Sequence, residues 1–346
     1  MSLHRAINIL LLPFSAIYGL VTTIRNLLFQ AKVLPQKQAP QYVIAVGNLT
    51  LGGTGKTPVT EYLVRELQHQ FKLAILSRGY GRKTKGFHWA TPTSTTRCIG
   101  DEPMQFYEKF SPGVVVAVSE NRFLGATKIQ ETHSKVQIII LDDAYQHRSI
   151  QRDINILLND YNRPFYEDYP VPGGRLRERR RGANRADIVL VTKCPTQLTG
   201  ATKLHIKSKI HKYCAADTPI VFAGIKYGAP SFLINQGQEI KKVLILTGIA
   251  APETFIQELN KRYTIIGTKT LPDHYNYTET DVKELIRNLK SNTFVLTTEK
   301  DFVKLRPLVM NTPLANKIAY IPIEVDFGPD KNTFDQFIQQ KLDQIK

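Results

Sequence analysis

The pattern of apolar and polar positions along the chain changes near residue 40. Residues 7–24 form one uncharged stretch, whereas the chain after residue 40 consists of short apolar runs separated by segments of helical spacing. Most of these runs are rich in β-branched residues and do not alternate with polar ones, which is typical of strands buried on both faces. The pattern therefore predicts an α/β fold in which helices flank a parallel sheet.

Two successive series of elements are expected. The first has strands at 42–46, 73–76, 114–118, 138–141, 154–158 and 188–192 and helices at 58–69 and 119–132. The second has strands at 220–223, 243–247, 263–266, 293–297 and 318–323 and helices at 252–262, 278–290 and 332–344. Thr278 and Asp281 have capping-box spacing at the start of one of these helices. We therefore predict a membrane-associated helix at 1–30, a first lobe at 31–215 and a smaller α/β lobe at 216–346 that contributes to the active cleft.

The uncharged stretch at 7–24 is just long enough to cross a bilayer, which takes about 17–25 residues. Its polar positions recur on one helical face, at Asn8, Ser15, Gly19, Thr22, Thr23 and Asn26. That pattern favours a helix that lies in the membrane interface. A spanning helix and a helix packed on the protein's own core remain alternatives. A signal peptide is disfavoured because no convincing small-x-small cleavage site follows.

A glycine-rich segment, GNLTLGGTGKTP at 47–58, lies between a predicted strand and a predicted helix. This context is typical of a P-loop, in which backbone N–H groups and the helix N-terminus hold phosphate oxygens. Lys56 is expected to contact the β- and γ-phosphates, and the Thr57 hydroxyl to bind Mg²⁺. The strict pattern has glycine where this chain has Thr50. The residues predicted to bind the nucleotide are Thr50, Leu51, Gly52, Gly53, Thr54, Gly55, Lys56 and Thr57.

Two adjacent carboxylates, Asp142 and Asp143, follow the apolar run at 138–141. The carboxyl end of a buried parallel strand beside a P-loop is a common place for Mg²⁺ to be held, directly or through water. A run that ends in Asp-Asp is weak evidence by itself, but its pairing with the P-loop strengthens it. Together the two motifs predict a site for ATP and Mg²⁺.

The charge of the chain is strongly positive. It has 46 Lys and Arg against 30 Asp and Glu, for a formal net charge of +16. This excess favours polyanionic partners such as nucleic acid, anionic lipid headgroups or phosphorylated substrates. No helix-turn-helix, zinc or RNA-binding signature supports nucleic acid, so we expect none as a partner. The three scattered cysteines fit a reducing cytosol rather than a disulfide framework.

Further segments carry a resemblance to a known family. They are SRGYGR at 77–82, GDEP at 100–103, DDAYQH at 142–147, PGGRLRE at 172–178, PDHYNY at 272–277 and TTEKD at 297–301. With the P-loop, and in this order, they resemble the tetraacyldisaccharide 4′-kinases of lipid A synthesis. Ala144, Tyr145 and Arg179 depart from the usual family residues beside these motifs.

The resemblance implies that ATP phosphorylates the 4′-hydroxyl of an acylated glucosamine disaccharide 1-phosphate. It also implies a P-loop fold with a second lobe and an N-terminal membrane helix, with Mg²⁺ as the metal. The expected location is the cytoplasmic face of a bacterial inner membrane, where the basic surface would contact lipid. No obligate protein partner is expected.

The resemblance also assigns roles to individual residues. Asp101 is implied as the general base, paired with His274 from the other lobe. Glu102 joins Thr57, Asp142 and Asp143 as a candidate ligand of Mg²⁺. The residues implied to line the site or to contact substrate are Arg78, Gln146, His147, Arg177 and Glu178. For Arg78 a loop salt bridge, and for His147 a structural role, remain alternatives.

An arginine-rich run surrounds Glu178. Its members are Arg175, Arg177, Arg179, Arg180, Arg181 and Arg185. A basic run is often only a solvated face. Here we favour contact with a substrate phosphate or with lipid headgroups.

One alternative is a P-loop switch or partitioning ATPase that acts on a membrane partner. It explains residues 42–147 but gives no role to PDHYNY. A GTP-specific protein should also carry an N/T-K-x-D motif, and TKCP at 192–195 lacks the aspartate.

Overall fold

The computed structural model describes residues 10–234, 240–290 and 292–343. The chain forms two compact units, and both are assembled from segments that are distant in sequence. Unit 1 comprises residues 1–78, 112–225 and 325–346, and unit 2 comprises residues 79–111 and 226–324. This division differs from the predicted contiguous lobes at 31–215 and 216–346. Residues 79–111 leave unit 1 to pack in unit 2, and the C-terminal helix returns to unit 1.

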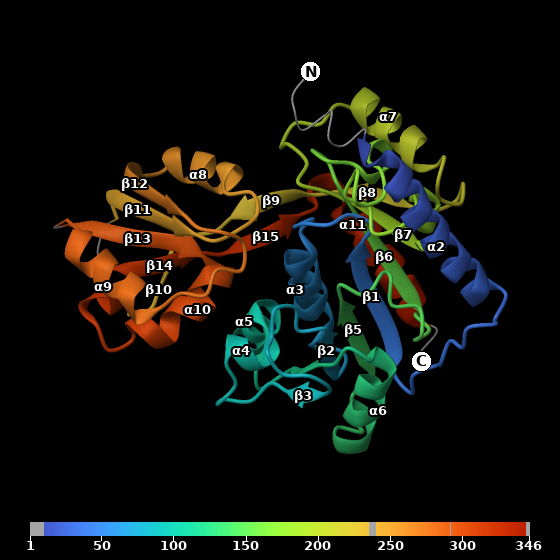
Figure 1. Ribbon diagram of the computed structural model, residues 1–346, viewed down its shortest axis with the longest axis horizontal. Coiled ribbons are helices and arrows are strands. Elements are labelled where there is room, and N and C mark those ends of the chain that lie inside the picture. Colours follow the sequence, from blue (N-terminus) through green and yellow to red (C-terminus); the bar gives the residue numbers. More distant parts are fainter. Residues whose placement is uncertain (1–9, 235–239, 291, 344–346) are drawn as a thin grey trace. The chain divides into compact units, whose positions relative to one another are not determined.

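Unit 1 is built on a parallel sheet whose strands lie in the order β4-β2-β5-β1-β6-β7-β8 (Figure 1). The strands are β1 (Tyr42–Asn48), β2 (Leu73–Ser77), β4 (Val115–Val118), β5 (Ile138–Asp142), β6 (Ile154–Asp160), β7 (Ile188–Thr192) and β8 (Ile220–Phe222). Their side chains are almost all buried, as the unalternating apolar runs predict. The predicted α/β class is therefore confirmed. The strand at 220–223, expected to open the second lobe, instead ends the sheet of unit 1.

The helices of unit 1 are α2 (Leu12–Gln30), α3 (Lys56–Leu67), α6 (Arg122–Thr132), α7 (Gly200–Ile210) and α11 (Lys331–Leu342). Short 3-10 turns are η1 (Phe165–Glu167), η2 (Arg180–Arg185) and η4 (Gly328–Asp330). α6 begins later than predicted because Asn121, which accepts a hydrogen bond from the Leu124 amide, caps it. α11 was expected in the second lobe. Phe334, Ile338 and Leu342 of α11 are buried.

Unit 2 contains a second sheet with the order β10-β14-β13-β11-β12. Its strands are β10 (Ser231–Phe232), β11 (Lys242–Thr247), β12 (Thr264–Thr270), β13 (Thr293–Thr298) and β14 (Ile318–Ile321), and only the pair β10–β14 is antiparallel. The helices are α4 (Thr96–Ile99), α5 (Asp101–Phe110), α8 (Glu253–Asn260), α9 (Glu279–Asn288), α10 (Glu299–Val309) and η3 (Pro313–Asn316). The capping box of Thr278 and Asp281 is present at α9, and α10 was not predicted. The remaining strands are β3 (His88–Trp89), β9 (Gly224–Tyr227) and β15 (Ile323–Asp326).

Helix α2 turns its polar face toward unit 1. Ser15 and Gly19 are buried, and the Ser15 hydroxyl accepts a hydrogen bond of 2.8 Å from the Gly173 amide. Most of its apolar residues point outward: Phe14, Ile17, Leu20, Val21, Ile24 and Leu27 are exposed, whereas Phe29 is buried. The alternative in which the apolar face packs on the protein's own core is therefore wrong. Among the described residues α2 alone is long and apolar enough to cross a membrane, and the first part of the predicted helix, with Ile7 and Asn8, lies outside those residues.

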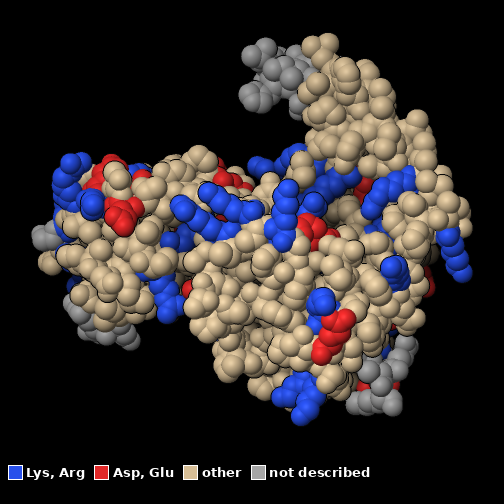
Figure 2. All heavy atoms as spheres, turned by 60° about the horizontal axis from the view of Figure 1, so that its bottom comes forward, with Lys and Arg blue, Asp and Glu red and all other residues tan. Residues whose placement is uncertain are grey.

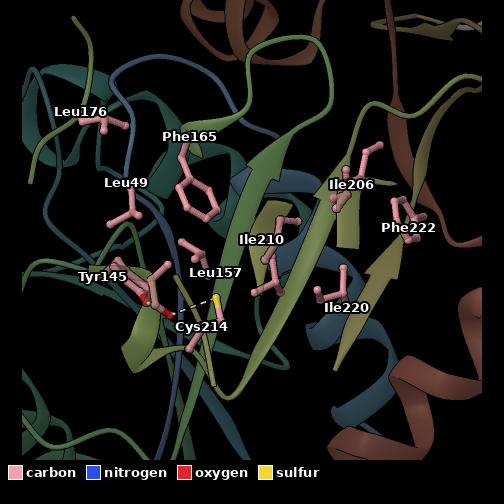
Figure 3. Packing of buried hydrophobic residues seen from close by; sticks show 14 residues of the cluster. Leu49, Tyr145, Leu157, Phe165, Leu176, Ile206, Ile210, Cys214, Ile220 and Phe222 are labelled. Atoms are coloured by element: carbon pink, nitrogen blue, oxygen red, sulfur yellow. Dashed lines mark hydrogen bonds between the residues drawn. The ribbon is translucent and has the colours of Figure 1, made fainter. Parts of the chain in front are cut away.

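A hydrophobic cluster supports the loop that follows β1. Leu49, Tyr145, Leu157, Phe165 and Leu176 are fully buried in it (Figure 3). The Tyr145 hydroxyl donates to the Gly182 carbonyl at 2.9 Å, so this departure from the family pattern has a partner inside the core.

Gly47, the penultimate residue of β1, leaves no space for a larger side chain. A Cβ at this position would lie 2.7 Å from the Tyr145 Cβ and 2.8 Å from the Tyr145 amide nitrogen. Since backbone is one of the clashing groups, we expect Gly47→Ala to lower the free energy of unfolding by about 1–3 kcal/mol. Urea unfolding measures the change. Gly200→Ala is the control because a Cβ there meets nothing within 4 Å. Equal stability of the two variants would contradict the close approach.

Candidate functional site

The P-loop connects the end of β1 to the start of α3. Gly52 and Gly55 have φ angles of +100° and +84°, a left-handed region that favours glycine. Gly55 is the N-cap of α3, and Lys56 and Thr57 are its first residues. The loop therefore presents backbone N–H groups and a helix N-terminus, which is the arrangement that binds phosphate.

The first part of the loop is held by the segment 175–177. The Leu51 amide donates to the Arg175 carbonyl at 2.7 Å, and the Arg177 amide donates to the Leu49 carbonyl at 2.7 Å. Between them Thr50 forms a β-bridge with Leu176. A position in extended conformation accepts any residue type, which explains why threonine is tolerated at position 50, where the strict motif has glycine.

The second part of the loop is held by residues that follow β7. The Thr192 hydroxyl donates to the Thr54 carbonyl at 2.8 Å. The ammonium group of Lys193 donates to the Gly53 carbonyl and to Asp160 Oδ2, the latter at 2.8 Å. Sequence reasoning missed these contacts, although TKCP follows a predicted strand, because this segment was tested only against the GTP-binding motif.

Asp142 and Asp143 lie where β5 ends, as predicted. The Ser77 hydroxyl donates to Asp142 Oδ2 at 2.7 Å. Asp143 Oδ1 lies 2.9 Å from an Arg177 guanidinium nitrogen and 3.7 Å from Lys56 Nζ. Burial favours the neutral acid, but Lys56 and Arg177 outweigh it and lower the pKa of Asp143 below its usual value. This corner of unit 1 thus brings together the P-loop lysine, an arginine and two ionised or hydrogen-bonded carboxylates.

Glu178 is a buried carboxylate whose two oxygens both accept hydrogen bonds. Arg185 binds it in a bidentate manner at 2.7 and 3.0 Å. Asn26 of α2 donates to it at 2.6 Å and Gln146 at 3.1 Å. Gln146 also donates to the Asn48 carbonyl at 2.9 Å. These contacts make Glu178 and Gln146 supports that join α2, the end of β1 and the loop after β5.

Several members of the arginine-rich run form ion pairs or hydrogen bonds within unit 1. Arg175 pairs with Asp168 at 3.0 Å, and the Arg180 side chain donates to the Asp168 carbonyl at 2.9 Å. With Arg177 and Arg185, these residues order the segment that holds the P-loop.

His147 lies among arginines. Burial and the charges of Arg122, Arg152, Arg25 and Arg78 lower the pKa of His147 from 6.5 to about 4. Its Nε2 atom lies 3.3 Å from the Arg122 amide nitrogen and 2.9 Å from the Ser149 hydroxyl. Arg78 itself is exposed and follows β2. The imidazole is therefore neutral at physiological pH and is bonded within unit 1.

Asp101 and His274 form a hydrogen-bonded couple in unit 2. Asp101, the first residue of α5, accepts a hydrogen bond at Oδ2 from His274 Nδ1 at 3.1 Å. His274 has a φ angle of +59°, and its ring centroid is 5.2 Å from that of Tyr80. Burial raises the pKa of Asp101, but the His274 hydrogen bond and the charges of Lys304 and Lys300 give a net decrease. The two residues were expected from different lobes; the packing of 79–111 in unit 2 puts them in the same one.

The candidate metal ligands are divided between the units. Thr57, Asp142 and Asp143 belong to unit 1, and Glu102 belongs to unit 2, where its Oε1 atom lies 3.4 Å from Lys300 Nζ. Within the described ranges, no group of three or more His, Cys, Asp or Glu side chains is arranged to hold a metal ion. Mg²⁺ usually takes one or two protein oxygens together with water and substrate phosphates, and the Thr57 hydroxyl and the Asp142 carboxylate of unit 1 are oxygen groups of this kind.

Comparisons with known proteins identify relatives over almost the whole chain. The family model of tetraacyldisaccharide-1-P 4′-kinase (LpxK) matches residues 7–343. A tetraacyldisaccharide 4′-kinase of Cytophaga hutchinsonii is 40% identical over 344 residues, which cover 97% of this chain and 96% of the relative. One from Flavobacterium johnsoniae is 41% identical over 343 residues, with 96% and 98% covered. The crystal structure of LpxK from Aquifex aeolicus in complex with ATP has a TM-score of 0.76 and 27% identity, with 97% and 99% covered.

The low pKa of His147 has a consequence for stability. Unfolding restores an ordinary histidine, so between pH 6.5 and 4 the unfolded chain binds the proton more readily and stability falls as the pH decreases. Allowing for the partial exposure of the ring, we expect wild type to lose about 1 kcal/mol more than His147→Gln between pH 7 and pH 5. Urea unfolding at both pH values gives the difference. Identical losses in the two proteins would show that His147 does not carry the effect.

Proposed function

This chain belongs to the tetraacyldisaccharide 4′-kinase family, and from that premise we propose that it transfers the γ-phosphoryl group of ATP to the 4′-hydroxyl of a tetraacyldisaccharide 1-phosphate. The product would be the 4′-phosphorylated precursor of lipid A. Two observations together support the proposal: a P-loop that its neighbours hold in place, and an ionised carboxylate, Asp101, that is hydrogen-bonded to His274. Phosphoryl transfer needs these two parts, because the phosphates must be held and the acceptor hydroxyl must lose its proton.

The nucleotide would be held by residues 50–57. Lys56 and Arg177 supply positive charge for the phosphates, and their present partner is Asp143. The Thr57 hydroxyl and the Asp142 carboxylate, which Ser77 orients, are oxygen ligands of the kind that Mg²⁺ prefers. A bound Mg²⁺ would neutralise charge on the transferred phosphoryl group.

Asp101 would accept the proton of the 4′-hydroxyl. Its Oδ2 atom is engaged by His274, so we assign the proton to Oδ1. The hydroxyl oxygen then forms its bond to the γ-phosphorus while the bond to the ADP oxygen breaks. His274 would stabilise the carboxylate and set its direction.

The substrate of such an enzyme is a lipid, and α2 gives the chain an apolar surface for a membrane. Ile17 and Val21 are 62% and 59% exposed on its outward face. Figure 2 shows more Lys and Arg than Asp and Glu side chains at the surface, in keeping with 46 against 30 in the sequence, and this positive charge favours anionic headgroups. We place the protein at the cytoplasmic face of the bacterial inner membrane, with α2 lying in the interface.

The kinase activity is tested with purified protein in detergent, ATP labelled in the γ position and tetraacyldisaccharide 1-phosphate. We expect labelled lipid from wild type, and a decrease in turnover of about 10²- to 10³-fold for Lys56→Met, because a charge on the transferred phosphates is lost. Lys128→Met is the control, since Lys128 pairs with Glu131 at 2.9 Å on the surface of α6. No transfer by wild type beside an active relative would refute the function, and full activity of Lys56→Met would refute the role of the P-loop lysine.

Membrane binding is tested by sedimentation with vesicles of phosphatidylethanolamine and phosphatidylglycerol. Ile17→Glu combined with Val21→Glu places two charges on the outward face of α2, and we expect the affinity to fall at least about tenfold, which corresponds to 1.4 kcal/mol. Leu204→Glu is the matched control because Leu204 is 70% exposed on α7. Equal sedimentation of the double variant and wild type would contradict the interfacial assignment of α2.

A further inference from the structure

Helix α10 carries two lysines, Lys300 and Lys304, that contact the Asp101–His274 couple. Residues four apart lie on the same side of a helix, so both ammonium groups extend from one face of α10. This helix packs against α5, which begins with Asp101. Both charges lower the pKa of Asp101, but neither lysine has a further role in the mechanism given above.

Lys304 contacts the Asp101 carboxylate from inside the protein. Its Nζ atom lies 3.4 Å from Asp101 Oδ2 and 3.1 Å from Asp301 Oδ1, and its side chain is 3% exposed. Asp301 is fixed in turn, because its Oδ2 atom accepts hydrogen bonds from the Gly248 amide at 2.8 Å and from the Thr298 hydroxyl at 2.7 Å. This buried positive charge lies beside Oδ2 of Asp101 and attracts it, which favours one placement of the carboxylate.

Lys300 contacts the other end of the couple. Its Nζ atom lies 3.1 Å from His274 Nε2, 3.1 Å from Asp273 Oδ1 and 3.4 Å from Glu102 Oε1. An ammonium group has three hydrogens to donate and no lone pair to accept with. His274 Nε2 must therefore be the acceptor. It follows that the ring hydrogen is on Nδ1, from which it is donated to Asp101 Oδ2.

We propose that Lys300 and Lys304 are the positioning residues of the couple: Lys300 holds His274 in the Nδ1–H tautomer, and Lys304 holds the carboxylate oxygen that receives this hydrogen. Both contacts leave Asp101 Oδ1 for the substrate proton. The catalytic part of this inference rests on the proposed function, whereas the tautomer is a property of the folded protein alone.

The tautomer is measured by nitrogen-15 NMR of protein labelled in its histidines, in detergent and without nucleotide. His274→Gln identifies the His274 signals among the eight histidines. We expect an Nδ1–H imidazole in wild type and in Lys300→Arg, which keeps a donor. In Lys300→Met the Nε2 atom loses its donor and only the Asp101 hydrogen bond still favours Nδ1–H, so we expect a larger population of the Nε2–H form that free imidazole prefers. An Nε2–H ring in wild type, or an unchanged ring in Lys300→Met, would overturn the proposal.

The role of Lys304 is measured by steady-state kinetics. A positioned base contributes about 10²- to 10⁴-fold to such a reaction, so we expect Lys304→Met to lower kcat by about 10- to 100-fold at an unchanged KM for ATP. The loss should not add to that of Asp101→Asn, because both variants disable the same carboxylate. If Lys304→Met does not fold, Lys304→Gln removes the positive charge but keeps a polar group in the buried space, and we expect the same loss of kcat from it.

Lys109→Met is the matched control for both measurements. Lys109 pairs with Glu299 at 2.7 Å across the same two helices, α5 and α10, and lies eight positions after Asp101 in the sequence. We expect it to change stability but neither the tautomer nor kcat. An equal loss of kcat in Lys109→Met and Lys304→Met, or additive losses with Asp101→Asn, would reduce Lys304 to a packing role and overturn its part of the proposal. Absence of kinase activity in wild type would refute the function, while the NMR measurement would still decide the tautomer.

Discussion

The structure depends on the requirement that a buried carboxylate be paired. Removing the partner of a buried charge costs about 3–5 kcal/mol, so each such group fixes the elements that supply its partners. Glu178 is 3% exposed and is held by Arg185, Asn26 and Gln146. Through these side chains it joins α2 to the segment that pairs with the P-loop. The proposed nucleotide site is thus supported by an ionic centre as well as by the sheet.

The same requirement explains how α2 is attached. Its hydrogen bonds to the rest of unit 1 come from polar residues: Ser15 accepts from the Gly173 amide, Tyr18 donates to the Arg177 carbonyl, and Asn26 donates to Glu178. Phe29 is buried with Arg148 over its ring, whereas the other large apolar side chains of the helix are exposed and remain available for lipid. These bonds end on residues 173–178, and the P-loop is held by residues 175–177. The same short segment of chain therefore contacts both the proposed membrane helix and the P-loop.

The strands, the P-loop and the α9 capping box were predictable because each depends on residues close together in sequence. Helix α10 was missed for a physical reason. Its residues Glu299, Asp301 and Lys304 are charged yet buried, so its polar pattern does not reveal its inner face. The boundaries of the units depend on which helices pack together. No pattern of neighbouring residues indicates that the segment 79–111 packs against α10. The hydrogen bonds from Thr192 and Lys193 to the P-loop likewise join residues that are far apart in sequence, so no local pattern predicts them.

The packing of unit 2 sets the ionisation state of Asp101 in the Asp101–His274 couple. A carboxylate that is mostly buried would ordinarily become a weaker acid and keep its proton, which would make it useless as a base. Here His274, Lys304 and Lys300 reverse that tendency, and all three belong to the same compact unit as Asp101. The carboxylate is therefore ionised by the fold of unit 2 itself. As the base of the proposed reaction, it would need no rearrangement of its own charges when the acceptor hydroxyl arrives, so its reorganisation cost would be met during folding rather than during catalysis.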